Sequence, residues 1–73
     1  MTLGQCLIAA RQEKGMNLAQ AGEKSGVSYA AISTWERGDR SPQFEKLEQV
    51  CMLAYDMSLI EFLQKYGYNG EEE

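Results

Sequence analysis

The sequence predicts an all-α fold, a compact bundle of five short helices, and three observations lead to that prediction. No stretch alternates apolar and polar residues as a half-buried strand would. Apolar residues recur instead at the three- and four-residue spacing of a helix face. Capping residues and glycines divide the chain into segments of helix length. With 73 residues, 44% of them hydrophobic and 25% charged, we expect one small globular domain.

The first two helices are marked by their ends. Thr2 and Gln5 have the spacing of a capping box, which predicts a helix over 2–14 that ends at Gly15. Its apolar face carries Leu3, Cys6, Leu7 and Ala10. Asn17 is the predicted cap of a second helix over 18–25, and Gly26 ends it.

The third helix follows after a very short turn. Ser28 is its predicted cap, it continues to about Glu36, and Gly38 ends it. The turn over 26–28 is too short for antiparallel packing, so the second and third helices should cross steeply. A steep crossing brings two backbones close, and we interpret Gly22 as the residue that avoids a collision with Ile32 or its neighbours. The side chains expected to pack this helix onto the rest are Val27, Ile32 and Trp35.

The fourth and fifth helices complete the predicted bundle. Ser41 followed by Pro42 predicts the start of the fourth helix, with the proline in its first turn. The residues expected to face inward from it are Phe44, Leu47, Val50, Cys51 and Ala54. Ser58 and Glu61 form a further capping box, and the helix they begin ends at Gly67. Its expected core face is Leu59, Phe62, Leu63 and Tyr66, with Met57 and Ile60 off that face.

The charges are unevenly distributed along the chain. The net charge is −4, but three of the eleven acids are Glu71, Glu72 and Glu73, which leaves eight acids against seven bases. We therefore expect a nearly neutral domain over 1–67 and an acidic, disordered tail over 68–73. Near-neutrality disfavours strong non-specific binding to phosphate.

The residue types exclude several kinds of site. There is no histidine, and Cys6 and Cys51 lie far apart at helix-period apolar positions, so we expect buried thiols and neither a metal nor a cofactor. The chain has no catalytic pair of side chains and no phosphate-cradling glycine loop, so we predict that it is not an enzyme and has no small-molecule substrate. No apolar run is long enough for a signal peptide or a membrane span, which predicts a protein without a membrane partner.

Several segments together resemble the lambda-repressor-like helix-turn-helix family, of the phage Cro and repressor type and including the XRE-like regulators. The segments are 3–15, Met16-Asn17, Gly22, 26–28, 32–38 and 42–47, and the resemblance extends over about residues 3–63. It implies five helices with the helix-turn-helix at the second and third, a role in transcription regulation and a two-fold dimer. It also implies a buried ion pair between Arg11 and Glu36, and a cytoplasmic protein encoded by a bacterium or a phage.

The third helix would then be the recognition helix. Its residues predicted to face bases are Ser28, Tyr29, Ala30, Ser33 and Thr34, and the predicted phosphate contacts are Asn17, Arg37 and Arg40. The chain departs from the family pattern at Leu18, Ala21, Tyr29 and Ala30. Methyl groups of alanine and threonine suit the thymine C5-methyl, so such a face favours A·T-rich sites.

Two functions are compatible with these residues. The first is a sequence-specific regulator, a small repressor that binds an A·T-rich palindromic operator in double-stranded DNA as a weak homodimer. The alternative is a protein-interaction module on the same fold, such as an antirepressor or a subunit of a larger regulator, with weak or no DNA binding.

Overall fold

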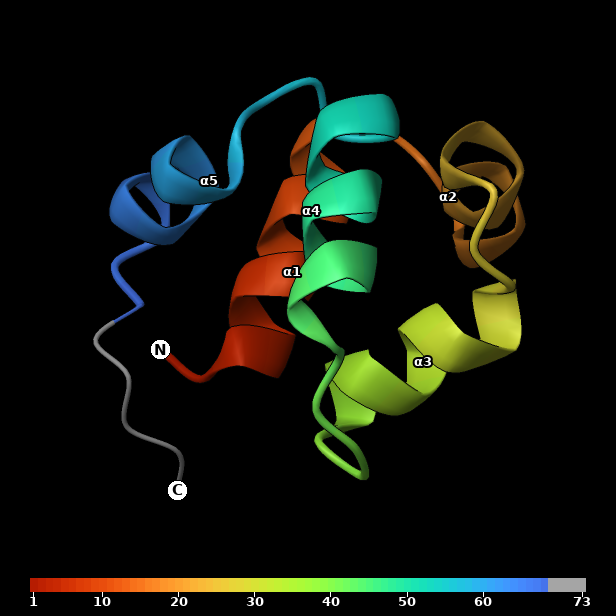
Figure 1. Ribbon diagram of the computed structural model, residues 1–73, viewed down its shortest axis with the longest axis horizontal. Coiled ribbons are helices and arrows are strands. Elements are labelled where there is room, and N and C mark those ends of the chain that lie inside the picture. Colours follow the sequence, from red (N-terminus) through yellow and green to blue (C-terminus); the bar gives the residue numbers. More distant parts are fainter. Residues whose placement is uncertain (69–73) are drawn as a thin grey trace.

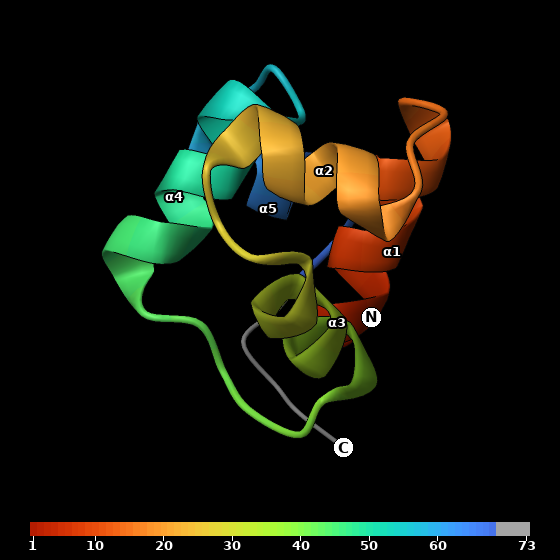
Figure 2. The ribbon, with the colours of Figure 1, turned by 90° about the vertical axis from the view of Figure 1, so that its right-hand side faces the viewer.

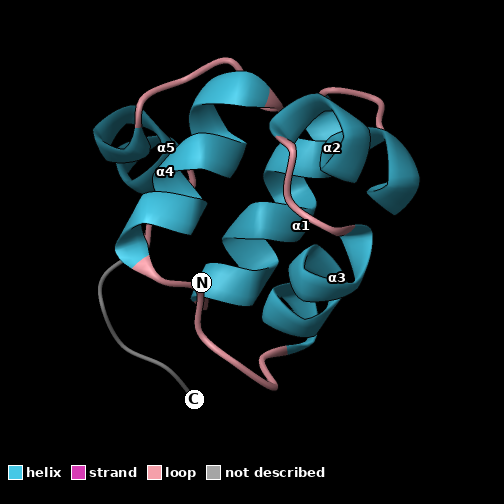
Figure 3. Cartoon of the chain, turned by 45° about the vertical axis from the view of Figure 1, so that its right-hand side comes forward, coloured by secondary structure: helices cyan, strands magenta, loops and turns pink. Residues whose placement is uncertain are grey.

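The structure is a computed structural model in which residues 1–68 are described. Within that range the chain forms α1 (Leu3–Glu13), α2 (Leu18–Ser25), α3 (Tyr29–Arg37), α4 (Phe44–Leu53) and α5 (Leu59–Lys65) (Figure 1). The all-α prediction is therefore confirmed, and Figure 3 shows only helices and loops in the described part. The acidic run 71–73 of the expected tail lies outside the described residues.

Local side-chain chemistry begins three of the helices. In each capping box the cap side chain accepts the N–H of the third helical residue, whose side chain accepts the N–H of the cap. The pairs are Thr2 with Gln5, Asn17 with Gln20, and Ser58 with Glu61. Ser28 caps α3 with a single bond, since its Oγ accepts from the Ala31 N–H at 3.2 Å. These four helix starts are where the sequence predicts them.

The start of α4 differs from the prediction. Its N-cap is Gln43, with no side-chain capping bond, and Gln43 has extended backbone with ψ 151°. An extended residue cannot lie inside a helix, so Ser41 and Pro42 belong to the preceding loop. Phe44, expected inward, sits on the first turn and is 66% exposed. The buried face of α4 therefore begins at Leu47.

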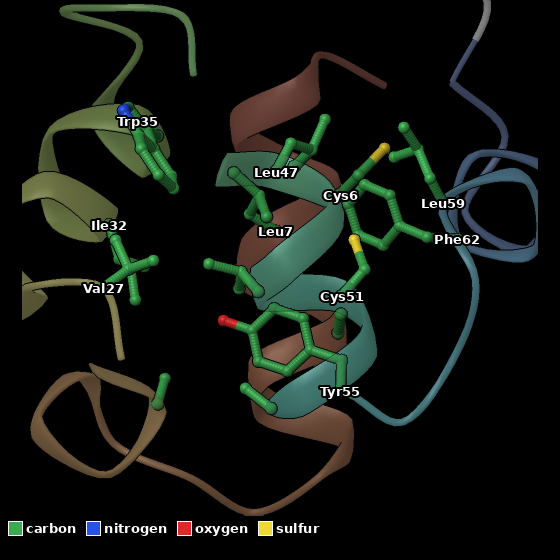
Figure 4. Packing of buried hydrophobic residues seen from close by; sticks show 14 residues of the cluster. Cys6, Leu7, Val27, Ile32, Trp35, Leu47, Cys51, Tyr55, Leu59 and Phe62 are labelled. Carbon is green, nitrogen blue, oxygen red and sulfur yellow. The ribbon is translucent and has the colours of Figure 1, made fainter. Parts of the chain in front are cut away.

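All five helices contribute to one core. α1 packs on α3 and α5, α2 packs on α3 and α4, and α4 packs on α5. The buried side chains, shown in Figure 4, are Cys6, Leu7, Ala10, Ala21, Val27, Ile32, Trp35, Leu47, Val50, Cys51, Ala54, Tyr55, Leu59 and Phe62. Cys6 and Cys51 are buried as expected, and burial raises the pKa of the Cys51 thiol to about 12.

Tyr55 is a core residue that the sequence pattern did not identify. It follows α4, is fully buried, and is the largest of the fully buried side chains among the described residues. No group within residues 1–68 forms a hydrogen bond with its hydroxyl. Burial, followed by the nearby Glu36 carboxylate, raises the pKa of Tyr55 above its ordinary value. The hydroxyl therefore stays protonated beside the helix pair α1 and α3.

Two glycines allow α3 to lie close to its neighbours. A Cβ on Gly22 would lie 2.9 Å from the Val27 carbonyl oxygen and 3.0 Å from the Tyr29 nitrogen. The predicted close approach of the two backbones at Gly22 is confirmed, and the nearest residues are Val27 and Tyr29 and not Ile32. A Cβ on Gly4 of α1 would lie 2.5 Å from the Glu36 carbonyl oxygen, a contact that the sequence did not predict.

The C-terminal part of the described chain is more closely packed than expected. Met57 and Tyr68 both pack partly against the core, although Met57 was placed off the core face and Tyr68 in the tail. The Tyr68 N–H donates to the Leu63 carbonyl at 3.0 Å. Ile60 is 68% exposed and remains off the core, as predicted. Each helix in the described range is too short or too polar to span a bilayer.

Candidate nucleic-acid interface

α3 lies at one end of the molecule, with α1, α2 and α4 together on one side of it (Figures 1 and 2). Gly26 ends α2 in the left-handed region at φ 76°, and α3 starts three residues later. The turn is held from two sides. Ser25 is buried and its Oγ accepts from the Val27 N–H at 3.2 Å, while Gln49 of α4 donates to the Ser25 carbonyl at 2.7 Å.

An ion pair fixes the C-terminal half of α3 to α1. Arg11 Nε donates to Glu36 Oε2 at 2.8 Å, and Arg11 Nη2 donates to Oε1 at 3.1 Å. The side chains are only 17% and 7% exposed. The bond to Glu36, which outweighs burial, raises the pKa of Arg11 above its ordinary value. Such a two-bond pair orients as well as attracts, so it sets the rotation of α3 about its own axis.

This rotation determines which residues of α3 face outward. Ile32 and Trp35 are buried, whereas Tyr29 is 60% exposed. Ala30 is also exposed, and Ser33 and Thr34 are half-buried. The five residues predicted to face bases therefore lie outside the core, Ser28 among them as the exposed N-cap. By helical spacing, Tyr29, Ala30, Ser33 and Thr34 lie on the side of α3 away from Ile32 and Trp35. We call these four residues, together with the exposed N-cap Ser28, the α3 outer face.

The serine and threonine hydroxyls of the α3 outer face are bonded within the chain. Thr34 Oγ1 donates to the Ala30 carbonyl at 2.8 Å, one turn back along the helix. Ser33 Oγ accepts from Arg37 Nη1 at 2.6 Å. Arg37 Nε in turn donates to Asp39 Oδ2 at 3.0 Å. The structure thus joins Arg37, predicted as a phosphate contact, to a residue predicted to face bases.

Arg40 borders the α3 outer face from the loop that follows. It lines an open hollow of about 300 Å³ together with Ala30, Ala31, Thr34 and Trp35. The hollow brings one predicted phosphate contact next to two residues predicted to face bases. A strand of DNA lying along α3 would meet the methyl groups and the guanidinium together.

The remaining predicted contact lies on α2. Asn17 is exposed and caps α2, with its side-chain oxygen accepting from the Gln20 N–H at 2.8 Å. Leu18 begins the helix and packs partly against the core. The chain therefore offers a side-chain amide and backbone N–H groups at this helix start, a combination that suits phosphate.

Asp39 is the residue of this region that the sequence analysis missed. Its contact with Arg37 spans only two residues, but it depends on Gly38, whose φ of 84° turns the chain back toward α3. A glycine between an arginine and an aspartate at a helix end is a signal that could have suggested the pair. Among the described residues, no three His, Cys, Asp or Glu side chains form a group that could hold a metal ion.

Comparison with known proteins agrees with this geometry. The model of the helix-turn-helix family matches residues 7–53, from α1 to the end of α4. The chain is 36% identical over 62 residues to the HTH-type transcriptional regulator PuuR of Escherichia coli (strain K12), and equally to that of Shigella flexneri. The match includes 85% of this chain, which spans about a third (33%) of the length of these regulators. The predicted resemblance is confirmed, and the chain belongs to the lambda-repressor-like helix-turn-helix family of DNA-binding transcriptional regulators, which is not a family of enzymes.

Proposed function

We propose that this chain is a sequence-specific transcriptional regulator that places α3 in the major groove of double-stranded DNA. The observation that carries the proposal is the α3 outer face. It belongs to a helix at one end of the molecule (Figure 1), its residues lie outside the core, and bonds from α1 and α4 fix the helix that carries it. Family membership supports the same role. Occupation of an operator would exclude other proteins from it, so we propose a repressor.

The α3 outer face favours A·T-rich operators. Thr34 uses its hydroxyl hydrogen on the Ala30 carbonyl. Thr34 and Ala30 therefore present mainly methyl groups to a base edge. In the major groove, methyl groups make apolar contact with the thymine C5-methyl. Tyr29 adds an exposed ring for apolar contact. Asn17 and Arg40 would hold the flanking phosphates, and residues 1–68 would form the DNA-binding domain.

A single α3 outer face has few groups that can distinguish one DNA sequence from another. We therefore propose that two copies bind a palindromic operator as a weak homodimer, with recognition helices about 34 Å apart. Because a regulator must reach its operator, we also propose that the protein is cytoplasmic and encoded by a bacterium or a phage.

Equilibrium binding tests this function. The full chain is titrated with an A·T-rich duplex, a G·C-rich duplex and a random pool, each at several salt concentrations. We expect preference for A·T-rich DNA and a linear fall of log K with log salt. Tyr29→Ala and Thr34→Ala should each change the preference by roughly 1–3 kcal/mol if the contact is good. Equal affinity for all duplexes, or no binding at about 50 mM salt, would overturn the proposal.

One observation favours the alternative of a protein-interaction module. Tyr29 is a large exposed ring at the start of a face whose serine and threonine hydroxyls are already bonded within the chain. Exposed aromatic surface of this kind also suits a protein partner. If Tyr29→Ala and Thr34→Ala leave DNA preference unchanged but disrupt a protein complex, the alternative replaces the first function.

A further inference from the structure

The guanidinium of Arg37 is oriented over the α3 outer face by two bonds at the surface, where the side chains of Arg37 and Asp39 are 59% and 61% exposed. Its Nη1 donates to Ser33 Oγ at 2.6 Å, and its Nε donates to Asp39 Oδ2 at 3.0 Å. Ser33 lies one helical turn before Arg37, so the side chain runs back along α3 toward the helix N-terminus. The N-terminal part of a recognition helix is the part that meets base edges.

Asp39 is itself fixed by the end of the helix. Gly38 closes α3 in the left-handed region, and the Asp39 N–H donates to the Thr34 carbonyl at 3.1 Å. This bond belongs to the helix cap, so the backbone of Asp39 is tied to the last turn of α3. The carboxylate is therefore placed by the same element that carries Arg37.

The two bonds leave a defined set of donors on Arg37. A guanidinium has five N–H groups, and here Nε and one hydrogen of Nη1 are used. The second hydrogen of Nη1 and those of Nη2 stay available at the outer end of the side chain. Paired donors of this kind match the O6 and N7 acceptors that guanine presents in the major groove.

The Asp39 carboxylate also argues against a phosphate as the ligand. A negative charge 3.0 Å from Nε offsets the positive charge of Arg37 and would repel a nearby phosphate. A guanine edge carries no net charge, so it loses less from that neighbour. A guanidinium already oriented by two bonds also loses less conformational freedom when it binds.

We propose that Arg37 contacts a guanine at the edge of the operator through its outer pair of N–H groups, with Ser33 and Asp39 as positioning residues. This inference rests on the proposed function. It adds one G·C pair to a site that the rest of the α3 outer face selects as A·T-rich, and it gives Arg37 a base-reading role in place of the phosphate role expected from the sequence.

The test compares variants on a duplex selected by the wild-type chain from a random library. Each guanine is replaced in turn by 7-deazaguanine, which lacks the N7 acceptor. Arg37→Lys keeps the charge but loses the paired donors. Asp39→Asn removes the carboxylate charge, and Asp56→Asn is its charge-matched control in the turn between α4 and α5, on the other side of the molecule from α3.

The proposal predicts one guanine whose 7-deaza replacement weakens wild-type binding about 5- to 140-fold, the range of a good paired contact. Arg37→Lys should abolish that dependence at nearly unchanged salt slope. Asp39→Asn should reduce the dependence on this guanine several-fold, and Asp39→Glu should retain part of the dependence that Asp39→Asn loses. The control Asp56→Asn should leave the dependence unchanged.

Two results would overturn the inference alone. One is binding with no guanine dependence in the wild type. The other is an Asp39→Asn variant that binds all duplexes more tightly with a salt slope larger by about one unit, since that is the signature of a phosphate contact. Failure of the wild type to bind any duplex would instead contradict the proposed function, and this inference with it.

Discussion

The Arg11–Glu36 ion pair shows how single residues prepare the α3 outer face without touching a ligand. Both side chains are largely buried, and Arg11 Nη1 also donates to the Met16 carbonyl at 3.1 Å. A buried charge is stable only while its partner and hydrogen bonds remain. The pair therefore links the orientation of α3 to the stability of the whole domain.

We predict that Glu36→Ala lowers the free energy of unfolding by about 3 kcal/mol, the lower end of the range for breaking a buried pair, because Arg11 keeps its bond to Met16. Urea denaturation measures the change. Lys65→Ala is the control, because it breaks a surface pair in which the side chains of Lys65 and Glu13 are 48% and 46% exposed, and it should cost clearly less than Glu36→Ala. Equal losses in the two variants would show that the Arg11–Glu36 pair contributes no more than a surface contact.

Arg40 carries a second prediction at this scale. Arg40→Ala should weaken binding to all duplexes alike and reduce the salt slope by about one unit, as expected for one lost phosphate contact. Lys14→Ala removes the same charge at the end of α1 and should leave the slope unchanged. A slope for Arg40→Ala equal to that of the wild type would remove Arg40 from the interface.

The residues that the sequence predicted, and those it did not, differ in how local their interactions are. Arg11 and Glu36 were expected from the family resemblance, and the two side chains form the pair. Asp39 and Tyr55 were not identified. The contact of Asp39 with Arg37 depends on the backbone path through Gly38, and the burial of Tyr55 depends on how α4 meets the rest of the core. Neither follows from a helical period.

At the scale of helices, the same distinction holds. The starts of α1, α2, α3 and α5 could be predicted because a cap and its partner are three residues apart. The start of α4 could not, because Ser41-Pro42 has the composition of a helix start while Gln43 has an extended backbone. The packing of α5 also depends on a partner far away in sequence. Lys65 Nζ donates to Glu13 Oε2 at 2.7 Å, and the Tyr66 hydroxyl donates to Glu13 Oε1.

This contact predicts a pH dependence for the attachment of α5 to α1. The bond from Lys65, then the bond from Tyr66, lowers the pKa of Glu13 below its ordinary 4.5. A lowered folded-state pKa contributes stability above pH 4.5, and that contribution is lost as pH falls through the folded-state pKa. The difference in unfolding free energy between the wild type and Glu13→Gln should therefore shrink as the solution becomes more acidic than pH 4.5.

At alkaline pH, stability is expected to fall as the pH rises, which is the opposite of the behaviour at acidic pH. Burial, then the bond to Glu13, raises the pKa of Tyr66 to about 12 from an ordinary 10.0. Its contribution is fully present below pH 10.0 and is lost as pH rises toward 12. Denaturant titrations of the wild type, Glu13→Gln and the exposed-acid control Glu23→Gln, repeated over a series of pH values, measure both the acidic and the alkaline change in stability. Parallel profiles for the wild type and Glu13→Gln would contradict the coupling of Glu13 to α5.

For the whole molecule, the proposed homodimer needs a contact surface. Ile60 is the exposed apolar residue of α5 at 68%, and Met52 and Leu53 of α4 are exposed at 56% and 58%. Met57 was expected to join them but packs partly inward, so the apolar surface offered by α5 is smaller than its sequence indicated. A small surface of this kind is consistent with a dimer that DNA completes.

We predict that Ile60→Glu reduces cooperative binding to a duplex with two half-sites and leaves binding to a single half-site unchanged. A buried charge at the contact would oppose association. Gln12→Glu adds the same charge to an exposed position of α1 and is the control. Sedimentation of the protein alone and with the two-half-site duplex measures the assembly. A wild type that is monomeric in both conditions would exclude the dimer.

The central claim is that the side chains of the α3 outer face choose the DNA sequence. Selection from a random duplex library tests it most directly when the wild type and the double variant Tyr29→Ala, Thr34→Ala are run side by side, after their thermal unfolding has been shown to match. The account predicts that the wild type enriches an A·T-rich palindrome and that the double variant enriches a different or weaker consensus. Recovery of the same sequence by both chains, or of none by the wild type, would contradict it.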